Sequence, residues 1–298
     1  MPNKDIFKER AKTFFWASLF FTKKKQKEVE TLYLFCRYID DLGDSDSETF
    51  QTKKKKLEKV KFQLLSKISE NPTILNFLNL SKNYNIKLEV PLHLIDGVLS
   101  DQKPVNILKF EDLVLYCYRV AGTVGLMMCS IMGVKNKKLF NHAIELGVAM
   151  QLTNISRDIR EDLDRKRIYL PKKFRNFQIK KRNVSLNKKQ KEVFASDICK
   201  LIDQSNELYE QARIGIFKLP FKYRLVILIA SNLYQRIGYE IAKNPKELWN
   251  RRIYVNLISK INITLISILY SMFGLFFRKK NVEKFPLNNI LIKYGIKF

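Results

Sequence analysis

Two pairs of aspartates have the residue type and spacing best suited to chemistry in this sequence. They are Asp40 with Asp44, in RYIDDLGD, and Asp158 with Asp162, in SRDIREDLD. Carboxylates four residues apart on a helix lie one above the other on the same face, so each pair can bind one cation or two adjacent ones. Asp is a hard oxygen donor, which points to Mg²⁺ rather than zinc. Mg²⁺ bound in this way keeps waters and binds phosphate oxygens.

Arginines flank both pairs, and their planar guanidinium groups suit bidentate binding of phosphate. They stand at Arg37, Arg157, Arg160, Arg165 and Arg167. Two acidic clusters rimmed by arginines describe a clamp for a diphosphate group and its Mg²⁺. The alternative is a pair of solvated helix faces with salt bridges, because like charges at i,i+4 need an opposite partner.

The residues around the pairs favour a ligand over a solvated face. Gln151, Asn154 and Asp158 follow at helical offsets and form a polar stripe with Asp162 in an otherwise apolar helix. Buried polar stripes are costly unless they are paired or used. The first pair also follows an apolar stretch, LYLFCRYI. We therefore expect both clusters to face the interior.

A third segment, residues 116–133, combines small and flexible side chains. Ala121, Gly122 and Gly125 lie in a helical stretch, where a glycine costs about 1 kcal/mol relative to alanine. Small residues allow a neighbour to come close, and that neighbour is either another helix or a flexible apolar chain. The methionines of this segment suit an adaptable apolar wall, with core filling as the alternative.

The elements that must position these residues read as helices. Apolar positions recur every three or four residues along nearly the whole chain, as in EVETLYLFCRYIDDLGD. Helix breakers separate the segments, at Asn71-Pro72, Lys103-Pro104, Gly133, Leu170-Pro171 and Leu219-Pro220. With 10 glycines, 8 prolines and no flexible linker, the 298 residues favour one compact domain. We expect an all-α protein of roughly eight to ten helices.

Cysteines and histidines carry little functional signal. The four cysteines, Cys36, Cys117, Cys129 and Cys199, lack metal-binding spacing and read as reduced residues of a cytosolic protein. The two histidines, His93 and His142, are too few for a His-rich zinc site and are interpreted as structural. The polar N-terminus indicates no signal peptide.

The strong positive charge has three readings. With 55 Lys and Arg against 29 Asp and Glu, the net charge is +26. Nucleic acid, an anionic membrane surface and a lysine-rich composition each account for it. A nucleic-acid-binding protein would not explain two spaced acidic motifs, because carboxylates repel phosphate. The apolar run 261–277 is shorter than the roughly 20 residues that span a bilayer, so it is expected to be a core or membrane-surface helix.

Three segments together resemble the squalene/phytoene synthase family. YLFCRYIDDLGD resembles its first aspartate-rich motif, and YCYRVAGTVGLMMCSIMGV and LGVAMQLTNISRDIREDLDRKRIYLP resemble its two signature segments. The resemblance runs from Phe14 to Lys260 and is closest to the bacterial phytoene synthases. It implies the all-α isoprenoid synthase fold, a single helical bundle around a central cavity. Residues 1–298 would form this one domain, with 14–260 as catalytic core and 261–298 as an apolar helix and basic tail.

The resemblance also implies roles for individual residues. The metal-binding and catalytic aspartates would be Asp40, Asp44, Asp158 and Asp162, with Asp41 and Glu161 beside them. Tyr118 would act in catalysis. Substrate-binding positions would be Tyr33, Arg37, Asp41, Gln151, Asn154, Arg157, Arg167, Tyr169, Tyr234 and Arg252, with Arg251 as the alternative to Arg252. One departure is Ala11, where the family usually has a serine, which places one phosphate contact in doubt.

The implied activity is that of a Mg²⁺-dependent prenyltransferase of the 15-cis-phytoene synthase type, in carotenoid biosynthesis. Two geranylgeranyl diphosphates would join head to head through prephytoene diphosphate. The alternative is the same chemistry on farnesyl diphosphate, giving squalene, dehydrosqualene or presqualene diphosphate. Mg²⁺ is the expected cofactor, with Mn²⁺ as its substitute, and no NADPH is expected because no nicotinamide-binding fingerprint occurs. We expect no nucleic-acid partner, and a cytoplasmic protein in peripheral contact with the anionic inner face of the cell membrane.

Overall fold

The protein folds into a bundle of α-helices. The structure is a computed structural model that describes residues 3–45, 47–102, 105–175, 187–273 and 286–296. Fourteen α-helices lie in these ranges. They are α1 (Asn3–Arg10), α2 (Lys12–Ser18), α3 (Lys23–Asp44), α4 (Phe50–Ser66), α5 (Pro72–Tyr84), α6 (Glu89–Ser100), α7 (Phe110–Cys117), α8 (Thr123–Ile131), α9 (Lys137–Arg157), α10 (Ile159–Asp164), α11 (Lys188–Ile216), α12 (Phe221–Lys243), α13 (Leu257–Phe273) and α14 (Leu287–Lys293).

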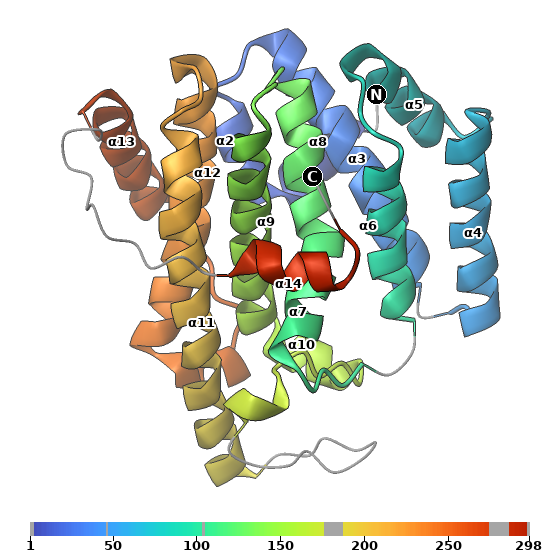
Figure 1. The fold of residues 1–298 in the computed structure, drawn as a ribbon. Helices are drawn as coiled ribbons and strands as arrows, with labels where there is room; N and C mark the ends of the chain where they lie inside the picture. Colours follow the sequence, from blue (N-terminus) through green and yellow to red (C-terminus); the bar gives the residue numbers. More distant parts are fainter. Residues whose placement is uncertain (1–2, 46, 103–104, 176–186, 274–285, 297–298) are drawn as a thin grey trace.

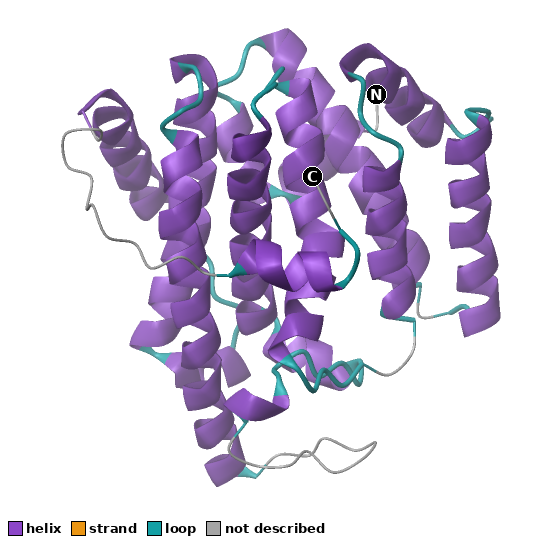
Figure 2. Cartoon of the chain, viewed as in Figure 1, coloured by secondary structure: helices purple, strands orange, loops and turns teal. Residues whose placement is uncertain are grey.

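The all-α prediction is confirmed, but the expected number of helices is too low. Short helices such as α2, α10 and α14 are about two turns or less. Sequence periodicity does not resolve elements of this length. The described residues form no β-strand (Figure 2), only an isolated parallel bridge between Asn106 and Ile168.

Helix α9 lies in the middle of the bundle. Figure 1 shows α11 and α12 on one side of it and α8 on the other, followed by α6 and α4. Helix α13 lies at the outer edge beyond α12, and α14 crosses the front of the bundle. One continuous cluster of buried side chains extends from Ala17 on α2 to Ile296 after α14. Both ends of the described chain therefore pack on the same core.

Local sequence signals set many of the helix ends. Thr22 caps α3, since its side chain accepts the backbone N–H of Lys25. Asn71 caps α5 immediately before a proline at the first helical position. Gly133 ends α8 with φ of +71°, a conformation that glycine adopts without strain. The predicted breakers are thus confirmed at these positions, whereas Lys103-Pro104 lies outside the described residues.

Helices α7 and α8 are joined without interruption by a π-helical turn, Tyr118–Gly122. The resulting helix, Phe110–Ile131, is long and apolar enough to cross a membrane by length and composition. Half of it is buried within the bundle, as in the core helix of a folded domain. Helix α13 covers the first part of the predicted apolar segment, and residues 274–277 lie outside the described chain. All four cysteines are free thiols, as predicted.

Candidate active site

The first acidic motif lies at the C-terminal end of α3 and faces the interior. Tyr33, Cys36 and Asp40 follow one another at single-turn spacing and line a central cavity. Removal from water raises the pKa of Asp40 to about 7. Arg37 acts in the opposite direction, and the carboxylate of Asp44 adds to the increase. Asp40 is thus a carboxyl group that holds its proton near neutral pH.

The second acidic motif lies where α9 ends. Asp158, with φ of −99° and ψ of 16°, separates α9 from α10. Its carbonyl still accepts the backbone N–H of Asp162 at 2.9 Å, so the two residues remain one turn apart as predicted. Burial raises the pKa of Asp162 to about 8, with a further increase from Asp158. Each motif therefore contributes one carboxyl group with a raised pKa.

Arginines hold the carboxylate of Asp158 from two directions. Arg157 donates from Nε and Nη2 to its two oxygens, at 2.8 and 2.7 Å. Arg252 donates to Oδ2 at 2.9 Å and lies 3.7 Å from Glu161. The neighbouring Arg251 pairs with Glu247 instead. The structure thus places Arg252, rather than Arg251, at the acidic site.

The two motifs meet through arginines of the segment after α10. Arg165 donates to Oδ2 of Asp44 at 3.0 Å, and Arg167 donates to Oδ1 at 3.1 Å. A tight turn at Lys166, with φ of +59°, separates the two arginines. Arg167 also donates its backbone N–H to the carbonyl of Asp162 at 2.7 Å. The two acidic motifs therefore lie close together, joined by contacts between the end of α3 and the segment after α10.

Asp101 is a site residue that the sequence analysis missed. It follows α6, and its Oδ2 accepts the hydroxyl of Tyr116 at 2.7 Å. Burial raises its pKa to about 6. Its carboxylate also raises the pKa of both Asp40 and Asp162, so its charge acts on both motifs. No motif spacing marks Asp101 in the sequence, since only the packing of α6 brings it there.

Tyr116 and Tyr169 form an aromatic pair beside Asp101. Their rings stack with centroids 4.8 Å apart, and their hydroxyl oxygens lie 3.2 Å apart, within hydrogen-bond distance. Burial raises the pKa of both phenols, so both remain protonated donors at neutral pH. Tyr169 was predicted from the family resemblance. Tyr116 was not, although it lies in the same segment as Tyr118.

The cavity extends from the acidic motifs into the bundle and has a volume of about 310 Å³. Its polar end carries Asp40, Gln151 and Asn154. Its far end is apolar and carries Met132, Leu139, Leu219, Phe21 and Ile227. Leu139 and Asn154 lie 15 residues apart on α9, which corresponds to about 22 Å of helix. The cavity is therefore long, polar at one end and apolar at the other.

The small residues of α8 serve two purposes at once. A Cβ at Gly125 would lie 2.4 Å from the carbonyl oxygen of Ala143, and one at Gly147 would lie 2.5 Å from that of Ala121. This backbone contact between α8 and α9 requires glycine. Ala121, Gly125 and Gly147 also line the cavity. Of the two neighbours that the sequence left open, the helix is α9, and an apolar chain in the cavity stays a prediction.

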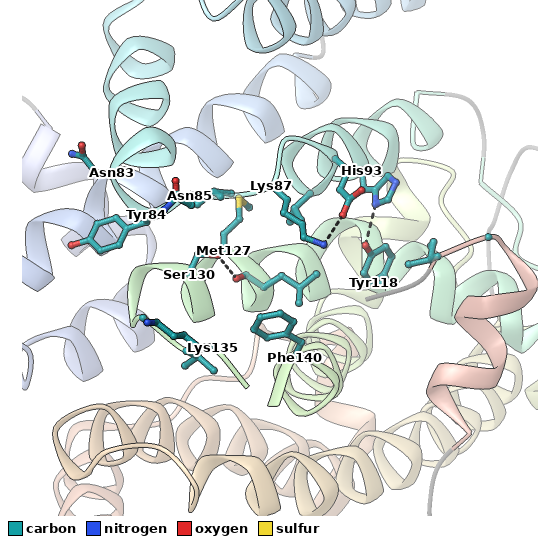
Figure 3. A pocket seen from close by; sticks show the side chains of 18 residues that line it. Asn83, Tyr84, Asn85, Lys87, His93, Tyr118, Met127, Ser130, Lys135 and Phe140 are labelled. Atoms are coloured by element: carbon teal, nitrogen blue, oxygen red, sulfur yellow. Dashed lines mark hydrogen bonds and ion pairs between the residues drawn. The ribbon is translucent and has the colours of Figure 1, made fainter. Parts of the chain in front are cut away.

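Tyr118 does not lie where the family resemblance predicted. Its side chain does not line the central cavity but a second pocket on the other face of α8. Figure 3 shows it directed toward His93 in that pocket. There its hydroxyl forms a hydrogen bond of 3.0 Å with Nδ1 of His93. The π-helical turn begins at Tyr118, and two residues along a helix differ by about 200° in direction. Tyr116 and Tyr118 consequently face opposite sides, and Tyr116 lies at the acidic site.

The other predicted positions are distributed around the polar end. Tyr33, Gln151 and Asn154 line the cavity as expected. The ring of Tyr234 lies 4.9 Å from that of Phe14, a cavity residue. Burial raises the pKa of Tyr234 to about 12, and Arg157 partly offsets this effect. Asp41 is exposed and forms an ion pair with Arg37, so these two lie at the rim.

The donor set fits Mg²⁺, although it is paired with arginines in this structure. Among the described residues, no three His, Cys, Asp or Glu side chains converge as a ready-made metal site. Asp44 and Asp158 are held by arginines. Oδ1 of Asp101 and Oδ1 of Asn154 are buried and have no hydrogen-bond partner in the described chain. Mg²⁺ prefers oxygen ligands such as these carboxylates. A bound cation would also reduce the repulsion between the carboxylates and give the unpaired oxygens a partner.

Residues 7–259 match the sequence profile of the squalene/phytoene synthase family. The chain belongs to this family. It is 28% identical over 268 residues to the 15-cis-phytoene synthase of Pantoea ananas, with 86% of each chain covered. It is 30% identical over 269 residues to the chloroplastic phytoene synthase of an Oncidium hybrid cultivar, covering 86% of this chain and 64% of that one.

Solved structures have the same fold. A dehydrosqualene synthase crystallised with a ligand superposes with a TM-score of 0.77 at 25% identity, covering 90% of this chain and 94% of that one. The squalene synthase HpnC from Alicyclobacillus acidocaldarius superposes with a TM-score of 0.70 at 21% identity, covering 81% and 92%. The isoprenoid synthase fold expected from the family resemblance is thereby confirmed. Membership of this family also identifies the protein as an enzyme of the prenyltransferase type.

Proposed function

We propose that this protein is a phytoene synthase that joins two molecules of geranylgeranyl diphosphate head to head. The observation that carries the proposal is the position of two acidic motifs at the polar end of a long apolar cavity. A diphosphate with a long hydrocarbon tail matches this polarity. The relatives named phytoene synthase support a C20 substrate, and they cover most of the chain.

Arginines would bind the diphosphate groups at the polar end. Three arginines already form ion pairs with carboxylates of the two motifs. Arg157 and Arg252 pair with Asp158, and Arg167 pairs with Asp44. When a diphosphate enters, these guanidinium groups can exchange a carboxylate for phosphate oxygens, which the planar guanidinium group can bind with two donors. The released carboxylates become free for a cation. Substrate binding and metal binding are therefore expected to support each other.

Asp40, Asp44, Asp158 and Asp162 would hold Mg²⁺, which neutralises charge on the departing diphosphate. The chain itself orients the substrates and keeps water away from the carbocation. Apolar side chains line the cavity beyond Tyr33 and Cys36. The faces of aromatic rings such as Tyr33 stabilise positive charge.

The reaction would proceed in two ionisations. Loss of diphosphate from one substrate generates a C1 cation, which attacks the double bond of the second substrate, and loss of a proton gives the cyclopropane of prephytoene diphosphate. A second loss of diphosphate, rearrangement and loss of another proton give phytoene. No hydride is consumed, so no NADPH is required. The protein must hold both hydrocarbon chains together in one water-free cavity throughout.

Product analysis with separate substrates tests the proposal. Purified protein with Mg²⁺ should convert geranylgeranyl diphosphate to phytoene at the same rate with and without NADPH. Farnesyl diphosphate should give little product. Turnover of farnesyl diphosphate alone, or absolute dependence on NADPH, would instead establish the alternative, a squalene or dehydrosqualene synthase. The solved dehydrosqualene synthase with the same fold is the reason to include that comparison.

Contact with the cytoplasmic face of the membrane is part of the proposal. A C40 hydrocarbon is insoluble in water and needs an apolar phase to receive it. The net charge of +26 favours anionic lipid, at about 1 kcal/mol per nearby basic residue. Release of the protein from vesicles at high salt would support peripheral contact.

A further inference from the structure

Helix α13 has the reverse of the usual amphipathic pattern. Its hydroxyl side chains Thr264, Ser267 and Ser271 are buried, with exposed fractions of 6% or less. Its large apolar side chains point outward, and Leu265 and Leu269 are 55% and 60% exposed. A helix on the surface of a water-soluble domain normally buries its apolar stripe. The outward face of α13 is therefore suited to an apolar environment.

Specific contacts hold α13 in this orientation. Trp16 Nε1 donates to Oγ1 of Thr264 at 3.0 Å, and Asn232 Nδ2 donates to Oγ of Ser267 at 2.9 Å. Arg224 donates to the carbonyl of Ser271 at 3.2 Å. These partners come from α2 and α12. Two of the inward hydroxyl groups and the backbone near the end of the helix are thus hydrogen-bonded to the bundle.

The apolar surface continues from α13 onto neighbouring turns. The contact of Arg224 with Ser271 places the start of α12 beside the end of α13. The rings of Phe21 and Tyr223 lie 6.2 Å apart, which brings the turn after α2 to the same end. The exposed apolar side chains there are Leu19, Phe20 and Phe221, next to Met272 and Phe273 at the end of α13. We name the outward face of α13 together with these five residues the apolar shelf.

The charge around the apolar shelf is positive. Helix α13 contains no Asp or Glu, and Lys260 is its one charged residue. Exposed lysines stand in the adjoining turns, at Lys23, Lys24, Lys218 and Lys222. An apolar surface with a basic margin complements the headgroups and acyl region of an anionic bilayer. Docking of a second protein chain on this apolar surface would not require a surrounding ring of lysines.

The apolar shelf also lies at the hydrocarbon end of the central cavity. Phe21 and Leu219 line that end of the cavity and belong to the same two turns that carry Phe20 and Phe221. The acidic motifs lie at the opposite end. A bilayer on the shelf would thus adjoin the part of the cavity where the hydrocarbon chains are held.

We infer that the apolar shelf docks on the surface of an anionic lipid bilayer, with α13 lying in the interface and the hydrocarbon end of the cavity turned toward the lipid. This inference deepens the membrane contact included in the proposed function. It assigns that contact to a defined surface and orientation. The acidic motifs then face the cytosol, from which diphosphate and metal ions enter and leave.

The test compares matched pairs of exposed residues in the full-length protein. The variant Leu265→Gln/Leu269→Gln removes apolar area from α13 without touching the core, since both side chains point outward. The control Phe62→Gln/Leu65→Gln changes two equally exposed apolar residues on α4, which are 69% and 57% exposed. Binding is measured by co-flotation with vesicles of phosphatidylcholine, with and without phosphatidylglycerol.

The wild type and the α4 control should bind vesicles that contain phosphatidylglycerol, and the α13 variant should bind at least about tenfold more weakly. Equal binding by the α13 variant and the wild type would overturn the inference. So would an equal loss in both double variants. Absence of vesicle binding together with a dimer that the α13 variant dissociates, by light scattering, would assign the shelf to a second copy instead.

Activity in detergent separates this inference from the proposed function. The α13 variant should form phytoene in detergent micelles at the wild-type rate, because neither leucine lies at the site. If no variant forms phytoene, the proposed function fails while the flotation result still decides the docking surface. If all form phytoene and bind vesicles equally, only the docking surface is wrong.

Discussion

Arg167 donates a hydrogen bond to Asp44 at 3.1 Å, although the two residues are 123 positions apart in the sequence. Because the backbone N–H of Arg167 also donates to the carbonyl of Asp162 at 2.7 Å, this contact links the two acidic motifs. Asp44 lies at the end of α3, and Arg167 lies in the segment that leaves α10. A substitution in one motif is therefore expected to change the hydrogen bonds and the geometry of the other.

Asp40→Asn and Asp158→Asn should each lower turnover by about two orders of magnitude or more while the fold survives. Each removes a charge that the cation and the departing diphosphate require. The control is Asp164→Asn, which changes an exposed aspartate at the end of α10, the short helix that follows Asp158. Steady-state rates and circular dichroism would be measured for all three. Near-normal turnover in both site variants would contradict the assignment of the acidic motifs.

The metal-free protein should become less stable between pH 6 and pH 8.5, as judged by its melting temperature, relative to Asp162→Asn. The pKa of Asp162 is raised from 3.8 to about 8 in the folded state. A folded carboxyl with a raised pKa contributes stability in full below the unfolded value, and this contribution is lost as pH rises through the folded value. Asp40, whose pKa is about 7, acts in the same direction.

Added Mg²⁺ should reverse this trend, because the ion binds the deprotonated carboxylates and its affinity rises with pH. The stabilisation by Mg²⁺ should therefore be larger at pH 8.5 than at pH 6. Asp162→Asn should show less of it at either pH. A melting temperature that does not respond to Mg²⁺ in the presence or absence of diphosphate would argue against a metal site between the motifs.

Tyr116→Phe should reduce turnover by about 10-fold to 100-fold, whereas Tyr118→Phe should have little effect. The hydroxyl of Tyr116 donates to Asp101, and a hydrogen bond to a charged group contributes about 1.5–3 kcal/mol. The hydroxyl of Tyr118 faces His93 on the other side of α8. Rates of the two variants would be compared at matched stability. A larger loss of turnover in Tyr118→Phe than in Tyr116→Phe would support the catalytic role of Tyr118 that the family resemblance implied.

Leu139→Trp should shift the preferred substrate from C20 toward C15. Leu139 lies at the apolar end of the cavity, about 22 Å along α9 from Asn154. A larger side chain there shortens the space for hydrocarbon without reaching the acidic motifs. Competition between geranylgeranyl and farnesyl diphosphate would be followed by product analysis. Leu75→Trp on the exposed side of α5 is the control, and an identical preference in both variants would place the length limit elsewhere.

The sequence by itself determined the helical fold, the family and most of the polar end of the site. Helical periodicity, caps such as Thr22 and breakers such as Gly133 are local signals, so they are readable without a structure. The aspartates of each motif are four residues apart, and that spacing alone puts them on one face. The sequence predicted that the two acidic clusters act together, but it did not indicate that Arg167 pairs with Asp44.

The tertiary structure decided which residues complete the site. Asp101 belongs to no motif, and only the packing of α6 brings its charge near both Asp40 and Asp162. Tyr116 and Tyr118 are two residues apart, and the direction of each depends on the rotation of α7 and the π-helical turn within the bundle. Periodicity likewise showed that α13 is apolar but not which face is buried. That choice follows from partners on α2 and α12 that donate hydrogen bonds to its hydroxyl side chains, because burial is a property of contacts rather than of the helix alone.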